Sequence, residues 1–144
     1  MNLKAPTDIV IYSIEKAIKS YRKMAQANIR KVERNITIDQ VLLLILLKNG
    51  PDLTQVEMAE MLFKDYASIT RMIELMVKND YLTRNENQED RRRKELIVSK
   101  KGENIITKLF PIIEENRNTA LKGLSQSEID LLDLLLKKII TNCN

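Results

Sequence analysis

The chain has 144 residues, of which 44% are hydrophobic and 31% are charged, and it contains only three glycines and three prolines. This length and mixture argue against a disordered or all-β chain and predict one soluble, strongly helical domain with its own core. The formal net charge of +4 permits nucleic acid or an acidic surface as a partner but requires neither. The absence of histidine and the lone Cys143 exclude a disulfide framework within the chain, a cysteine zinc site and most catalytic constellations.

The N-terminal apolar run is broken by charge and does not resemble the hydrophobic region of a secretory signal. The longest purely apolar run, at 41–47, is far shorter than the roughly 20 residues that a membrane-spanning helix needs. A single cysteine fits a reducing compartment. We therefore expect a cytoplasmic protein with no membrane partner and no cofactor, and not an enzyme.

Helical periodicity dominates the first half of the chain. Apolar residues recur at intervals of three and four from Val10, which predicts one long helix to about Glu33. A second helix follows, because Thr37 and Gln40 form a capping box and Gly50 begins a stop.

Two shorter helices come next. Another capping box, Thr54 with Glu57, opens a helix of about nine residues, and Asp65 is a good N-cap for a helix that runs to about Lys78. The inward face of this later helix is apolar and consists of Ile69, Met72, Ile73 and Met76. The side chains expected to face outward are Lys64, Tyr66, Ser68 and Arg71.

The period of the sequence changes after residue 80. Residues 81–86 and 94–98 alternate in part with a period of two and bracket the segment "NQEDRRRKE", which predicts a β-hairpin with a charged loop. A long helix from Ser99 to about Leu121 follows, in which Pro111 predicts a kink or a local break. Gly123 ends that helix.

The last helix opens with a third capping box, Ser125 with Glu128, and carries an apolar stripe. The stripe consists of Ile129, Leu132, Leu135, Leu136 and Ile139. The long helices carry more apolar surface than a small winged helix can cover, and the spare surface predicts a homodimer.

The order of elements predicts a mainly α protein with a small β-hairpin, in one domain over residues 1–144. A winged helix-turn-helix lobe is expected at about 36–98, and helices at about 8–34 and 99–142 are expected to form a dimerisation lobe. Positive charge is concentrated in the N-terminal helix and in the helix-turn-helix region: residues 1–35 hold eight Lys/Arg against three Asp/Glu, and residues 64–101 hold ten against seven.

The helix-turn-helix carries the first candidate site. A recognition helix needs small polar residues near its N-terminus so that its backbone can enter the major groove. Ala67, Ser68 and Thr70 meet this need, and Arg71 can reach a base edge or a phosphate. An αα-hairpin with a merely solvated outer face predicts the same two helices, so the alternative stays open.

The charged loop carries the second candidate site. Arginine suits the minor groove because its planar, weakly hydrated group tolerates the narrow space and negative potential there. Asp90, two residues before Arg92, could hold that guanidinium in place. The flanking cations Arg91, Arg93 and Lys94 would meet phosphates. The alternative is a loop that only keeps a sheet edge soluble.

From about residue 36 to residue 140 the chain resembles the MarR family of bacterial transcriptional regulators. The segments that carry the resemblance are "TIDQVLLLILLKNGPDLTQVEMAEML", "DYASITRMIELMVKNDYLTR", "NQEDRRRKELIVSKKG" and "LSQSEIDLLDLLLKKI". The resemblance implies a homodimer on pseudo-palindromic double-stranded DNA, usually acting as a repressor. It implies major-groove contacts from Ser68, Thr70 and Arg71, and a minor-groove contact from Arg92 that Asp90 orients. It also implies a small aromatic or anionic effector. Tyr12, Tyr21 and the arginines near Arg22 could line a cleft for it, and packing explains the tyrosines equally well.

Two positions depart from the family's pattern. Phe63 and Asp80 stand where the family often has glycine, at the turn within the helix-turn-helix and before the hairpin. Aspartate tolerates left-handed backbone better than phenylalanine does, so Phe63 is the position that puts the turn geometry in question. The main hypothesis is a DNA-binding regulator, and its rival is a winged-helix module that binds protein and has lost DNA affinity.

Overall fold

A computed structural model describes residues 1–86 and 94–144. Most of the described chain is helical, and its only sheet within these ranges is a two-stranded antiparallel hairpin. The elements are a short 3₁₀ helix η1 (Pro6–Asp8), the α-helices α1 (Val10–Val32), α2 (Ile38–Asn49), α3 (Gln55–Met61), α4 (Tyr66–Lys78), α5 (Lys100–Ala120) and α6 (Gln126–Cys143), and the strands β1 (Leu82–Glu86) and β2 (Lys94–Val98). The expected mainly α fold with a winged helix-turn-helix lobe is confirmed; η1 was not expected.

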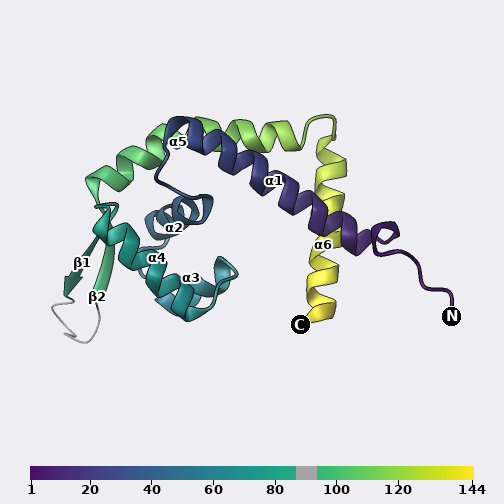
Figure 1. Cartoon of the computed structure of the whole chain (residues 1–144), viewed down its shortest axis with the longest axis horizontal. Helices are drawn as coiled ribbons and strands as arrows, with labels where there is room; N and C mark the ends of the chain where they lie inside the picture. The colour runs from purple at the N-terminus through teal and green to yellow at the C-terminus, as the bar shows by residue number, and fades with distance from the viewer. Residues whose placement is uncertain (87–93) are drawn as a thin grey trace.

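The long helices and the helix-turn-helix occupy different parts of the molecule (Figure 1). Helices α1 and α5 pack against each other along the top of the view, and α2, α3, α4 and the hairpin lie below them. Helix α6 descends on the right, well away from the hairpin. The register of the hairpin runs from Leu82 opposite Val98 to Glu86 opposite Lys94.

The helix starts expected from the sequence are confirmed. In each of the three capping boxes the N-cap hydroxyl accepts from the N3 backbone N–H, and the N3 side chain accepts from the N-cap N–H. Helix α3 has 7 residues rather than about nine. Helix α2 ends at Asn49 and Gly50 follows as its C-cap.

One apolar core joins the two parts of the molecule. Helix α2 lies at its centre: Leu43 and Leu44 are completely buried, as are Ile69 and Ile73 of α4. Leu109 of α5 is also completely buried in the same cluster. Met72, expected on the inward face of α4, is only half-buried. Apolar packing on α2 therefore holds α4 and α5 in one core.

Of the kink or local break expected at Pro111, the break is wrong, because α5 is one continuous helix from Lys100 to Ala120 with Pro111 inside it. A proline in this position removes one backbone hydrogen bond. Leu109 and Ile113, on either side of it, are buried in the core against neighbouring elements. Burial of these side chains offsets the lost hydrogen bond, so the helix continues.

No residue of helix α6 is buried within this chain. Its apolar residues are exposed or half-exposed, and five of them are counted among the large exposed hydrophobic side chains. These five are Leu131, Leu132, Leu134, Leu135 and Ile140.

The two positions where the family often has glycine both adopt left-handed backbone. Phe63 has φ of 57° and Asp80 has φ of 64°. The Phe63 side chain is 95% exposed, so no burial of its ring compensates the backbone strain. The helix-turn-helix turn therefore keeps the glycine geometry although it lacks the glycine.

Candidate nucleic-acid interface

The N-terminus of α4 is built by its cap. The carboxylate of Asp65 accepts a hydrogen bond from the backbone N–H of Ser68 at 2.7 Å. This bond, with further ones from the same turn, lowers the pKa of Asp65 below its ordinary value although desolvation acts in the opposite direction. An ionised Asp65 at the N-cap therefore fixes the first turn of α4.

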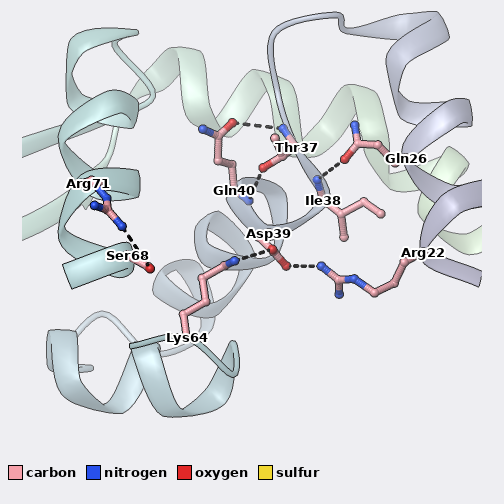
Figure 2. A network of polar contacts seen from close by, with 9 residues as sticks. All are labelled: Arg22, Gln26, Thr37, Ile38, Asp39, Gln40, Lys64, Ser68 and Arg71. Atoms are coloured by element: carbon pink, nitrogen blue, oxygen red, sulfur yellow. Dashed lines mark hydrogen bonds and ion pairs between the residues drawn. The ribbon is translucent and has the colours of Figure 1, made fainter. Parts of the chain in front are cut away.

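The outer face of α4 near that cap is accessible and carries both large and small side chains. Tyr66, Ala67 and Arg71 are exposed and Ser68 is half-buried. The Arg71 guanidinium lies 3.5 Å from the Ser68 hydroxyl, a distance at the long end for a hydrogen bond (Figure 2). Arg71 is thus held loosely beside the start of the helix and is accessible to a partner.

Thr70 lies against α3 and not on the outer face. Its hydroxyl donates to the Tyr66 carbonyl at 2.9 Å and accepts from the side-chain amide of Gln55. Both hydrogen-bonding roles of the hydroxyl are therefore used within the protein, and Thr70 is half-buried. This arrangement ties α3 to α4.

Lys64 also differs from the expectation that it faces outward. Its ammonium lies 3.0 Å from a carboxylate oxygen of Asp39, and 30% of its side chain is exposed. The other oxygen of Asp39 accepts from the Arg22 guanidinium. Figure 2 shows Asp39 between these two cations, which come from α1 and from the turn before α4.

The Asp39 carboxylate is ionised in this position. Burial by itself would raise its pKa, but the hydrogen bonds and charges of Arg22 and Lys64 outweigh burial, so the pKa lies below its ordinary value. This role was not predictable from the sequence, because the helix dipole alone explains an acid in the first turn of a helix.

Gln26 fixes the start of α2 against α1. Its amide donates to the Ile36 carbonyl at 3.3 Å. It also accepts from the Ile38 backbone N–H at 2.9 Å (Figure 2). Gln26 follows Arg22 by one helical turn, so both side chains act from the same face of α1. The sequence suggested Arg22 only for an effector cleft and did not single out Gln26.

A cavity of about 800 Å³ lies beside α4. It is bounded by the segment between α2 and α3, by α4 and by the hairpin. Its lining is apolar in part, with four charged residues, Asp52, Glu74, Arg84 and Glu95. Tyr12, Tyr21 and Arg22, which the sequence suggested for an effector cleft, do not line this cavity.

The remaining candidates come from the charged loop. Asp90, Arg91, Arg92 and Arg93 lie outside the described residues. For Lys94 the structure describes the backbone, which begins β2.

The arrangement of α2, α3, α4 and the hairpin is that of a winged helix-turn-helix. The family model "MarR family" matches residues 36–94, which span α2, α3, α4 and β1. This segment therefore resembles the MarR family, and its fold is assigned as a winged helix-turn-helix.

Solved structures agree with this assignment. BpsR from Bordetella bronchiseptica has a TM-score of 0.83 and 19% identity over 96% of this chain and 97% of that chain. Its structure is described as showing how 6-hydroxynicotinic acid regulates DNA binding by BpsR. MepR of S. aureus in complex with DNA has a TM-score of 0.81 and 19% identity, covering 97% and 100%. A mutant MarR from E. coli complexed with operator DNA has a TM-score of 0.75 and 21% identity, covering 94% and 99%. At these identities the likeness establishes the fold.

Across the described ranges 1–86 and 94–144, no helix combines the length and apolarity needed to cross a membrane.

Proposed function

We propose that this chain is a sequence-specific repressor that binds pseudo-palindromic duplex DNA as a homodimer. The observation that carries the proposal is the exposed start of α4, where Tyr66, Ala67 and Arg71 are accessible next to the Asp65 cap. An α-helix with this end free can enter a major groove and place an arginine at a base edge. The relatives that are described with DNA have the same fold.

The homodimer is supported by the uncovered apolar surface of the long helices. Leu132 and Leu135 of α6 are 45% and 46% exposed, and Ile11 and Ile18 of α1 are also exposed. Phe110 of α5 is 51% exposed. Exposed apolar side chains on three long helices are typical of a surface that an obligate interface covers. Two copies related by a two-fold axis would present two recognition helices to a duplex, which predicts an inverted repeat.

The cavity beside α4 is the place that we propose for a small-molecule effector. Its apolar walls suit an aromatic ring, and a ligand held between α4 and the hairpin would alter how both meet DNA. Three of its four charged residues are acidic, so an aromatic ligand with a positive or no charge complements it better than an anion. Titrating the DNA complex with an aromatic amine and an aromatic carboxylate of equal size tests the charge preference.

The test of DNA recognition is selection of bound sequences from random duplex DNA, followed by affinity measurements over a range of salt. We expect an inverted repeat with half-site centres roughly 34 Å apart, and an affinity that falls steeply as salt rises. Arg71→Ala should remove the preference at one position of each half-site. Lys78→Ala is the matched control, because it removes the same charge from the far end of α4.

The rival function is a winged-helix module that binds another protein. It predicts weak duplex binding with no selected sequence. It also predicts that Arg71→Ala and Lys78→Ala have equal effects, since only net charge would then matter.

A further inference from the structure

We propose that Asp39 is a positioning residue for DNA recognition: it fixes the recognition helix α4 relative to the dimerisation helix α1 and thereby restricts which half-site spacings the dimer accepts. The inference rests on the proposed function, because it concerns a dimer on an inverted repeat.

Asp39 joins three elements through one carboxylate. One oxygen accepts from Arg22 of α1, and the other lies 3.0 Å from the ammonium of Lys64. Asp39 itself is in the first turn of α2. Only 19% of its side chain is exposed, so these contacts are less screened than those of a surface pair.

Lys64 is the residue through which Asp39 acts on α4. It directly precedes the N-cap Asp65, and its backbone N–H donates to the Ala59 carbonyl at 2.9 Å, across the turn from α3. The preceding residue, Phe63, is held in left-handed backbone. A turn this short transmits a displacement of Lys64 directly to the first residues of α4.

Gln26 completes the connection at the other end. It holds the backbone on both sides of Thr37 against α1, two residues before Asp39. The position of α2 along α1 is therefore fixed by hydrogen bonds, and Asp39 extends this fixed point to the turn before α4. Apolar packing in the core is not directional and permits small rotations, whereas two charged contacts on one carboxylate define a direction.

The consequence for DNA is a restricted spacing. One added base pair moves a half-site by about 3.4 Å and rotates it by roughly 35° around the duplex. A dimer whose recognition helices are held rigidly loses contacts on one half-site when the spacing changes. A dimer with a looser connection between α1 and α4 recovers part of those contacts.

The experiment measures the affinity of each protein for the selected site and for the same site with one base pair added to or removed from its centre. The readout is the ratio of the two affinities for one protein sample, in which any inactive fraction cancels. We expect wild type to bind the selected spacing much more tightly than the altered one. In Asp39→Asn the ratio of these two affinities should be at least about threefold smaller, within the range by which such mutations alter coupling.

Glu103→Gln is the matched control. Glu103 also lies in the first turn of a helix and also forms an ion pair between elements, with Lys48 at 3.2 Å, but it makes no contact with the turn before α4. Glu103→Gln should show the same ratio of affinities for the two spacings as wild type. Arg22→Gln removes the contact between α1 and Asp39 without changing Asp39 itself. It should lower the ratio of affinities in the same way, which keeps the test available if Asp39→Asn folds poorly.

If Asp39→Asn and Arg22→Gln show the same ratio of affinities for the two spacings as wild type, the inference is overturned and the proposed function stays intact. An equal change in Glu103→Gln would overturn it as well, because the effect would then be general. Absence of any selected sequence for wild type would instead refute the proposed function, and the inference with it.

Discussion

Gly102 lies directly against the backbone of Tyr81, so closely that a β-carbon at position 102 would be 2.4 Å from the Tyr81 carbonyl oxygen. The hydroxyl of Ser99, the N-cap of α5, accepts from the Gly102 N–H at 3.0 Å. The ammonium of Lys101 donates to the Asn79 carbonyl at 2.8 Å and lies 4.9 Å from the centre of the Tyr81 ring. The segment "SKKG" therefore joins the start of α5 to the end of α4.

Gly102→Ala should lower the free energy of unfolding by about 1–3 kcal/mol, because backbone atoms of the two elements must separate to admit the methyl group. Urea unfolding at a fixed protein concentration measures it, since the stability of a dimer depends on concentration. Gly50→Ala is the control: its β-carbon would approach the flexible side chain of Leu53 at 3.2 Å and would lie at an ordinary contact distance, 3.6 Å, from the Leu46 carbonyl oxygen. Equal losses for both variants would contradict the prediction.

Phe63→Gly should stabilise the protein by up to about 1 kcal/mol. Left-handed backbone costs a residue with a side chain roughly 1–2 kcal/mol, and the greater flexibility of glycine in the unfolded chain offsets part of the gain. Phe63→Ala separates the two causes, because it removes the exposed ring and keeps the strain. A gain for alanine equal to that for glycine would show that the ring, not the backbone, was responsible.

The sequence left the turn geometry at Phe63 in question. Phe63 and Asp80 stand where related sequences often have glycine, and the structure shows that the backbone requirement persists although the residue has changed. The helix starts were predictable, since a capping box is a local signal of four residues. Local rules also predicted the hairpin and an apolar stripe on α6, of which Leu132 and Leu135 are exposed.

Contacts between distant parts of the chain could not be predicted in this way. Asp39 meets Arg22 and Lys64, which are far from it in sequence and belong to different elements. Lys64 was expected to face outward because no residue near it in the sequence indicates that Asp39 is its partner. The local rule for Pro111 allows a kink or a break, and the burial that keeps the helix continuous comes from neighbouring elements.

Replacing Leu132 or Leu135 with glutamate should convert the protein to a monomer, because each change puts a charge into the surface that we propose for the dimer. Sedimentation at micromolar concentration measures the mass. Lys138→Glu alters the charge on an exposed residue of the same helix and should leave the dimer intact. A wild-type protein that sediments as a folded monomer would refute the interface.

Asp39→Asn should lower the free energy of unfolding at pH 7 by on the order of 1 kcal/mol, a value suited to a partly exposed charged cluster. The folded-state pKa of Asp39 is below its unfolded value, so its contribution is present above the unfolded pKa and is lost as the pH falls through the folded one. The difference between wild type and Asp39→Asn should thus be steady from pH 5 to 8 and shrink below about pH 4. A difference that persists in acid would assign the effect to packing.

The last prediction concerns Asp90 and Arg92, which lie outside the described residues, so it rests on the sequence. The strands that flank them are paired as far as Glu86 opposite Lys94. If Arg92 enters the minor groove, Arg92→Ala should cost on the order of 1–3 kcal/mol per half-site. Arg93→Ala, at a proposed phosphate contact, should weaken all sequences alike and reduce the salt slope by about one unit for each lost contact.

The direction in which Asp90→Ala changes the affinity for DNA distinguishes the two roles of the loop. If Asp90 only adds negative charge near a polyanion, removing it should tighten binding to every duplex, by simple Coulomb attraction. If Asp90 holds the Arg92 guanidinium in the orientation that the groove requires, removing it should weaken binding and reduce sequence preference, although the protein becomes more positive. We expect the weakening, measured as affinity for the selected site and for a scrambled duplex at the same salt. Tighter binding with unchanged preference would assign the loop to solvated surface.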